Sequence, residues 1–121
     1  MGTILVGTSG YSYDDWVGPV YPPGTDRRDF LRLYAQRFSF TELNFSYYRL
    51  PAERALAQIA AKVPDRFQFV VKAYRSITHD RGAGWEHDAE RFLNALTGLG
   101  SKLVGILLQF PYSFHYTTEN R

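Results

Sequence analysis

Cysteine is absent from this 121-residue sequence, so neither a disulfide bond nor a thiolate metal site can form. No apolar run approaches the roughly 20 residues that a membrane-spanning helix needs. Residues 1–6 lack the basic start and long apolar centre of a signal peptide. Because the lack of cysteine also suits a reducing compartment, we expect a soluble, cytoplasmic domain with no membrane partner.

An excess of one charge is also lacking. The formal net charge is +2, and the lysines and arginines are scattered along the chain rather than clustered. Proteins that bind nucleic acid usually carry a basic patch or stripe, so the charge pattern argues against such a partner. Binding of single-stranded nucleic acid through exposed tyrosines and arginines is kept as an alternative.

The sequence is rich in aromatic residues, which make up 17% of the chain, while the apolar share of 45% is ordinary for a globular protein. Buried tyrosine and phenylalanine rings therefore contribute much of the expected core. The length predicts a single domain over residues 1–121.

Four apolar runs predict β-strands, at residues 4–7, 40–46, 67–73 and 105–110. Stretches with apolar residues at helical spacing separate them. Strands that alternate with helices favour a parallel sheet with right-handed crossovers, and hence an α/β fold. Such a chain forms either one half of an eight-stranded βα barrel or a small open sheet with helices on both faces.

Three helices are expected between these strands. Thr25 or Asp26 can cap the first, and Pro51 is a favoured first residue for the second. Gly98 or Gly100 would end the third. Apolar residues at helical spacing define the inner face of each helix. They are Phe30, Leu31, Tyr34, Ala35 and Phe38 in the first helix, Ala55, Leu56, Ile59, Ala60 and Val63 in the second, and Phe92, Leu93, Leu96 and Leu99 in the third.

The loops differ in length in a way that indicates where a ligand would bind. Connections from helix to strand are short, whereas residues 11–25 and 74–87 form long loops after the first and third strands. In βα folds ligands bind at the carboxyl ends of the strands. The long loops predict a site at that edge of the sheet.

The end of the sequence suggests a truncated protein. Residues 117–121 resemble the start of a helix with a threonine cap, and nothing after them would cover the edge of the fourth strand. An exposed strand edge promotes association with another chain. We therefore expect self-association through open sheet edges.

Several short motifs resemble the domain of unknown function 72, the YecE-like proteins. They occur in the expected order over nearly the whole chain: GTSGYSY at 7–13, WVGP at 16–19, YP at 21–22, ELN at 42–44, YRLP at 48–51, FVVKA at 69–73, ITH at 77–79, QFP at 109–111 and SF at 113–114. The resemblance implies a TIM-type barrel about twice this length, with this chain as the amino-terminal half, made of about four βα units. Tyr74 and Tyr112 stand where the resemblance implies proline. The family has no settled activity, so the resemblance implies a fold rather than a reaction.

Polar residues near the carboxyl ends of the strands are the candidate catalytic groups. Glu42 and Asn44 alternate with apolar residues, and a desolvated Glu42 could act as general acid or base while Asn44 orients a substrate. By the same alternation Lys72 and Gln109 face the pocket, as an electrostatic clamp and a hydrogen-bond donor. The alternatives are that Glu42 and Asn44 only fix the register of the strands and that Lys72 forms a structural pair with Glu42.

His79 follows the third strand and is a candidate second proton carrier, although loop histidines are more often simply exposed. The sequence contains no His-Asp-His or His-x-x-x-His spacing, so these residues alone do not assemble a metal site. No metal is assigned, and the cofactor is unknown.

Six further residues are predicted to contact substrate. Residues 7–10, with Thr8 and Ser9, could cradle a phosphate, but a tight turn that requires glycine is the favoured interpretation. Tyr13, Trp16, Tyr48 and Arg49 could line the pocket, as could Tyr21 and Tyr47, or these residues could pack the long loops onto the sheet.

The predicted function is that of a TIM-barrel enzyme, complete in a longer form, that acts on a small polar or anionic substrate by acid/base chemistry. The alternatives are a non-catalytic protein that binds a ligand or single-stranded nucleic acid, and an inactive truncated product.

Overall fold

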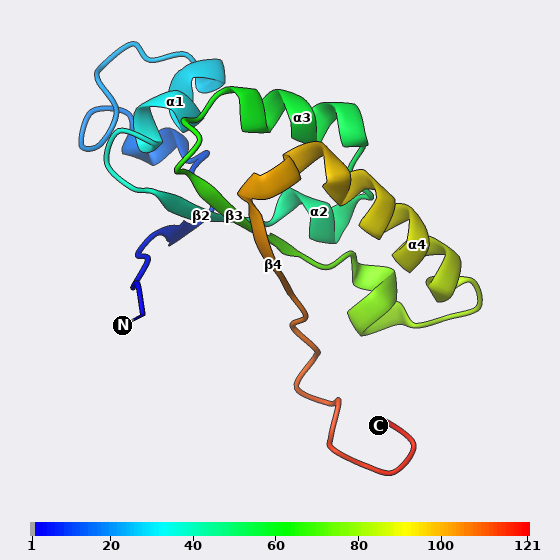
Figure 1. Ribbon diagram of the computed structural model, residues 1–121. Helices are drawn as coiled ribbons and strands as arrows, with labels where there is room; N and C mark the ends of the chain where they lie inside the picture. The colour runs from blue at the N-terminus through cyan, green and yellow to red at the C-terminus, as the bar shows by residue number, and fades with distance from the viewer. Residues whose placement is uncertain (1) are drawn as a thin grey trace.

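The computed structural model describes residues 2–121 of the chain, which fold into one four-stranded parallel sheet with helices between the strands (Figure 1). The strands are β1 (Thr8–Ser9), β2 (Phe40–Leu43), β3 (Gln68–Lys72) and β4 (Leu103–Leu107). Their order in space is their order in the sequence, and each pairs in parallel with the next. The predicted α/β fold with parallel strands is confirmed.

The helices α1 (Phe30–Tyr34), α3 (Glu53–Ala61) and α4 (Trp85–Leu96) lie along one side of this sheet. In Figure 1, α1, α3 and α4 all run over the same side, and none of them covers the other. The helical elements of the described chain are η1 (Asp14–Trp16), η2 (Arg27–Asp29), α1 (Phe30–Tyr34), α2 (Phe45–Tyr48), α3 (Glu53–Ala61), the π-helix η3 (Ser76–Asp80), α4 (Trp85–Leu96) and η4 (Thr97–Lys102). The sheet therefore has a covered face and an open face.

The core lies between the covered face and the helices. Thr41 and Leu43 of β2 are buried, as are Phe69 and Val71 of β3. The residues that alternate with them are only partly buried, because they point to the open face. This alternation places Glu42 and Lys72 on the same open face.

Tyr34 ties the first two strands to α1. Its ring is fully buried and stacks on Phe38 at a centroid distance of 4.9 Å. Its hydroxyl accepts a hydrogen bond from the backbone N–H of Thr8 at 2.7 Å and donates to the carbonyl of Phe40 at 2.9 Å. A buried tyrosine needs such partners, and here they hold β1 in place beside β2.

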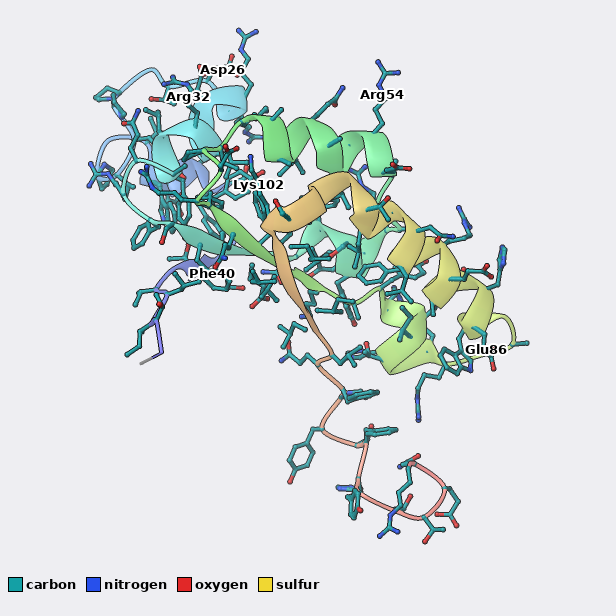
Figure 2. The ribbon with its side chains drawn as sticks, in the orientation of Figure 1. Asp26, Arg32, Phe40, Arg54, Glu86 and Lys102 are labelled. Carbon is teal, nitrogen blue, oxygen red and sulfur yellow. The ribbon has the colours of Figure 1, made fainter. Side chains whose placement is uncertain are left out.

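Two contacts fix the packing of α3. A Cβ atom at Gly98 would lie 2.2 Å from the carbonyl oxygen of Glu53, so only glycine permits this close approach of η4 to α3. The ammonium of Lys102, labelled in Figure 2, donates to the carbonyls of Ala60 and Val63 at 2.7 and 2.9 Å. These carbonyls lie at and just beyond the carboxyl end of α3, where a cation is favourable.

Three predicted strand boundaries are wrong. The run at residues 4–7 does not form a strand: Ile4 and Val6 are 89% and 67% exposed, and pairing begins at Thr8. Within the described residues no strand lies on the far side of β1, so this run has neither a hydrogen-bonded neighbour nor a surface to bury against.

The second strand ends at Leu43 rather than at residue 46, because the chain turns there into α2. The fourth strand starts and ends earlier than predicted. A bulge shifts its register after Phe69, and Lys72, the last residue of β3, pairs with Leu107. After this pair, the N–H of Ala73 donates one further hydrogen bond to the carbonyl of Leu107.

Of the predicted helix starts and stops, the cap at Asp26 and the break at Gly100 are confirmed. The side chain of Asp26 accepts a hydrogen bond from the N–H of Arg28, and Gly100 breaks the helical backbone after α4 with φ +56°. The prediction that Pro51 is the first residue of the second helix is wrong, because α3 begins at Glu53 with Ala52 as its N-cap. The hydroxyl of Thr117 accepts a hydrogen bond from the N–H of Asn120 at 3.3 Å within a turn. No helix within residues 2–121 has the length and apolar character needed to cross a membrane.

Candidate functional site

A chain of hydrogen bonds joins three predicted site residues at the carboxyl ends of β1 and β2. The side-chain N–H of Asn44 donates to the hydroxyl of Ser9 at 2.6 Å, and this hydroxyl donates to Oε1 of Glu42 at a longer 3.4 Å. The parallel register makes Ser9 the direct neighbour of Glu42. Glu42 is therefore the final acceptor in this series of hydrogen bonds.

The side-chain oxygen Oδ1 of Asn44 is buried and has no hydrogen-bond partner among the described residues. Asn44 lines a small cavity of about 220 Å³ whose walls come from the loop after β1 and from the end of β2: Gly10, Tyr11, Ser12, Tyr13, Glu42, Leu43, Asn44 and Phe45. A buried acceptor without a partner costs about 1–3 kcal/mol. The cavity therefore favours a group that can donate a hydrogen bond to Asn44.

Ser46 anchors α2 onto the neighbouring strand. Its side chain is completely buried, and its hydroxyl donates to the carbonyl of Lys72 at 2.6 Å, with a longer contact of 3.4 Å to the carbonyl of Leu43. The short helix is thereby held over the carboxyl end of β3. This contact places Tyr47, the next residue, beside the side chain of Lys72.

Lys72 lies on the open face, and its ammonium is 4.7 Å from the centroid of the Tyr47 ring. Such a cation–π contact is worth about 0.5–2 kcal/mol, depending on how far the cation is removed from water. The ring attracts the cation without neutralising it. The Lys72 ammonium is therefore available to an anionic partner.

Lys72 and Glu42 do not form an ion pair. Within the described residues, the pairs with N···O distances of 4.0 Å or less all lie elsewhere: Arg27–Asp14, Arg28–Asp26, Arg32–Asp29 and Arg75–Asp80. The structural pair considered from the sequence is therefore not formed. Both charges lie on the open face and neither offsets the other directly.

His79 lies in the π-helix η3, directly after β3. Its ring packs against the edge or face of the Tyr47 ring at a centroid distance of 5.1 Å and a near-perpendicular angle of 80°. Its Nδ1 is 2.8 Å from the hydroxyl of the buried Thr78, which leaves Nε2 as the other exchangeable position. Single-turn π-helices are frequent at functional sites.

Asp80, the residue after His79, has a partner of its own. The hydrogen bond from Arg75 holds the pKa of the Asp80 carboxyl below its usual value, and both Arg75 and Asp80 are exposed to solvent. This pair joins Arg75, the residue before η3, to Asp80, its last residue. We therefore assign Asp80 to the shape of this loop and not to proton transfer.

Tyr13 also belongs to the site. Its hydroxyl donates to the carbonyl of Ser9, and its ring lines the cavity beside Glu42 and Asn44. A Cβ atom at Gly10 would approach the Tyr13 hydroxyl to 2.9 Å, and Gly10 has φ +87°. The favoured interpretation of residues 7–10 as a turn that needs glycine agrees with this geometry.

The structure does not bring the other predicted substrate contacts to this group. The hydroxyl of Thr8 is engaged with Gly10 and Tyr34, and Trp16 packs between Tyr13 and Tyr34 at centroid distances of 4.8 and 6.4 Å. Both therefore hold the loops onto the sheet, which is the alternative stated for Trp16 above.

Tyr48, Arg49 and Gln109 are exposed. Tyr48 shows 74% of its surface to solvent, and Gln109 lies beyond the end of β4. Arg49 lines a neighbouring groove of about 670 Å³ beside α3, together with Lys62, and this groove shares Tyr11 and Phe45 with the cavity at Glu42. A contact between these residues and a substrate stays a prediction.

Two residues that shape the site were not among the predicted site residues: Ser46 and Thr78. The sequence does contain a signal for Ser46, because asparagine is a common residue before the first turn of a helix and could have ended the strand at Leu43. The contact between Thr78 and His79 depends on the π-helix, which has no comparable signal.

No group of three or more His, Asp or Glu side chains within residues 2–121 is arranged to hold a metal ion. The cation-binding candidates of the open face are single groups: Glu42 and the oxygen of Asn44. The chemistry available at the site is therefore hydrogen bonding, proton transfer and binding of an anion by Lys72.

The fold and the site together define an α/β protein with consecutive parallel strands and polar groups at their carboxyl ends. The chain belongs to the family described as "Protein of unknown function DUF72", whose profile matches residues 5–121. The resemblance noted in the sequence is thereby confirmed.

Relatives with known sequence or structure are longer than this chain. It is 33% identical over 124 residues to the UPF0759 protein YunF of Bacillus subtilis strain 168, covering 97% of this chain and 43% of the relative. A crystal structure of a DUF72 family protein from Enterococcus faecalis V583 is similar with a TM-score of 0.81 and 28% identity, covering 98% of this chain and 43% of that one.

A second crystal structure of that DUF72 family protein has a TM-score of 0.69 and 30% identity, covering 79% of this chain and 41% of that one. The chain therefore spans less than half the length of the relatives it matches.

Proposed function

We propose that this chain forms the first half of a TIM-type barrel whose complete form is an enzyme acting on a small polar or anionic substrate. A doubly wound sheet carries helices on both faces and reverses its strand order. Here the strand order does not reverse, and α1, α3 and α4 share one side in Figure 1, as helices do on the outside of a barrel. The greater length of the relatives supports a second half.

In this proposal the open face of the sheet is part of the inner wall of the barrel. Glu42 is the general acid or base, and Lys72 binds or stabilises an anionic group of the substrate. Asn44 orients the substrate, and His79 is a second proton carrier. The site lies at the carboxyl ends of the strands, where barrel enzymes bind their substrates.

One observation carries the proposal: Glu42 and Lys72 share the open face without pairing with each other. Glu42 pairs in register with Val70, so Lys72 lies one strand over and two residues further along. With strands about 4.8 Å apart and a rise of about 3.3 Å per residue, their Cα atoms are roughly 8 Å apart. That separation leaves room for a small molecule between the two charges.

Hydrogen–deuterium exchange into substrate carbon tests the proposal without a known product. The protein is incubated in D2O with a panel of small hydroxy acids, keto acids and sugar phosphates, and loss of C–H signals next to the carbonyl is followed by proton NMR. A general base contributes about 10²–10⁴-fold to such a step. Glu42→Gln should therefore slow exchange at least 100-fold.

Glu53→Gln and Lys62→Met are the matched controls, because both residues lie at or beside the ends of α3 and are exposed. They should exchange at the wild-type rate, whereas Lys72→Met should weaken substrate binding. Exchange that is unaffected by Glu42→Gln and Lys72→Met would contradict the assigned roles. No exchange with any member of the panel would remove proton abstraction from these compounds as a reaction of this chain.

A further inference from the structure

We infer that the site has two chemically different ends and takes a small ligand that carries a hydroxyl group at one end and a phosphate or carboxylate at the other. The inference rests on the site of the proposed function and names its ligand class. It also assigns Tyr47 as the residue that positions the anion-binding end.

The end formed by Glu42 and Asn44 requires hydrogen-bond donors. One N–H of the Asn44 amide and the hydroxyl of Ser9 donate within the cluster, and the carboxylate of Glu42 and the side-chain oxygen Oδ1 of Asn44 remain as acceptors. A ligand hydroxyl can donate to either of them. An anionic group would instead meet the negative charge of Glu42, so it does not belong at this end.

The end formed by Lys72 and His79 favours an anion. The Lys72 ammonium and the centre of the His79 ring are each about 5 Å from the centre of the same Tyr47 ring, so they lie at most about 10 Å apart. The charge of Lys72 has no carboxylate partner within 4.0 Å among the described residues. A phosphate or carboxylate is the complementary group.

The two ends are close enough for one small molecule to reach both. The Cα atoms of Glu42 and Lys72 are roughly 8 Å apart by the spacing of parallel strands, and both side chains point from the same face. A chain of a few carbon atoms spans this distance. Hydroxylated phosphates and hydroxy acids of that length combine the two required groups.

Tyr47 holds the anion-binding end in place. Its ring is the surface on which the Lys72 ammonium lies and against which the His79 ring packs. The bond from Ser46 to the Lys72 carbonyl fixes the helix that carries Tyr47. We therefore treat Tyr47 as a positioning residue that acts through Lys72.

The experiment follows the lysine side chains by NMR in protein labelled with carbon-13 at the lysine ε position. The sequence contains three lysines, so Lys62 and Lys102 serve as internal controls for Lys72. The probes are inorganic phosphate, glycerol, glycerol 3-phosphate and glycerate at constant ionic strength. Phosphate has the anion alone, glycerol the hydroxyls alone, and glycerate replaces the phosphate by a carboxylate.

In the unmodified chain, phosphate should shift the Lys72 signal, and glycerol 3-phosphate should bind at least tenfold more tightly than phosphate. The ratio between glycerol 3-phosphate and glycerate then shows which anion the site prefers. This comparison requires no variant, so it stays decisive if a substitution impairs folding. Equal affinities for phosphate and glycerol 3-phosphate, or shifts confined to Lys62 and Lys102, would overturn the inference.

Two substitutions separate the ends. Asn44→Ala should abolish the tenfold preference for glycerol 3-phosphate and leave phosphate binding unchanged. Tyr47→Leu should remove the ring-current shift of the Lys72 ε carbon and protons and weaken both ligands, whereas Tyr47→Phe, which keeps the ring, should restore both. A Tyr47→Leu protein with an unchanged Lys72 spectrum would refute the positioning role.

These results are distinguishable from a failure of the proposed function. Tight binding of glycerol 3-phosphate without any carbon–hydrogen exchange would support the ligand class and contradict the acid/base role of Glu42. Exchange that depends on Glu42 but shows no preference for a hydroxylated anion would contradict the inference and leave the acid/base role in place.

Discussion

Replacing Ser46 by alanine removes the hydroxyl that joins α2 to the end of β3. This hydroxyl is fully buried and donates to the Lys72 carbonyl at 2.6 Å. A buried hydrogen bond contributes about 0.5–1.5 kcal/mol, and a buried group left without its partner costs about 1–3 kcal/mol. We therefore expect Ser46→Ala to lower the free energy of unfolding by about 1–3 kcal/mol.

Urea denaturation followed by tryptophan fluorescence measures this loss. The control is Ser101→Ala, an exposed serine of η4, which should change the unfolding free energy by no more than about 0.5 kcal/mol. Loosening α2 should also reduce the ring-current shift that Tyr47 exerts on Lys72. A Ser46→Ala protein with an unchanged urea midpoint and an unchanged Lys72 signal would refute the role of Ser46 as an anchor.

Gly98→Ala should destabilise the protein by about 1–3 kcal/mol, because the added Cβ would overlap a carbonyl of α3. The control is Gly82→Ala, where no atom lies within 4 Å of the added Cβ. This control should be neutral or slightly stabilising in the same urea assay. Equal effects would contradict this contact. The lowered pKa of Asp80 means that its pair with Arg75 contributes stability above the ordinary carboxyl pKa of 3.8 and loses it as the pH falls further. The difference in melting temperature between wild type and Asp80→Asn should therefore shrink at pH 3, and a constant difference would argue against the pair. The open edges of β1 and β4 should cause concentration-dependent self-association in sedimentation velocity, and a monomer at every concentration would contradict it.

The regular part of the fold could be predicted because its pattern is local. The third strand was expected at residues 67–73 and is observed at Gln68–Lys72, since Phe69 and Val71 bury against the helices while their neighbours face outward. The apolar run at residues 4–7 looks equally strand-like in the sequence. Whether it pairs depends on a neighbouring strand, which no local pattern reveals.

The candidate site could be predicted in part for the same reason. The two-residue period of a strand places Glu42 and Lys72 on one face, as the structure has them. The same period predicted that Ser46 continues the strand and faces the same side as Glu42, which is wrong. The chain enters α2 after Asn44, and Ser46 is buried in the interior. The contacts of Tyr47 and His79 join separate elements and depend on their packing.

The roles of residues in the long loops could also not be predicted from the sequence alone. Trp16 could be read as a ligand platform or as packing, and only its neighbours decide that it covers Tyr34. Arg49 follows the polar strand closely in sequence but lies in the groove beside α3. Closeness along the chain therefore did not place Arg49 in the cavity that Glu42 lines.

The central claim is that ligands bind on the open face between Glu42 and Lys72. A crystal of this protein soaked with glycerol 3-phosphate tests it most directly. The account predicts density with the phosphate at Lys72 and a hydroxyl within hydrogen-bond distance of Glu42 or Asn44. Density confined to the groove lined by Arg49 and Lys62, with the open face empty, would contradict it.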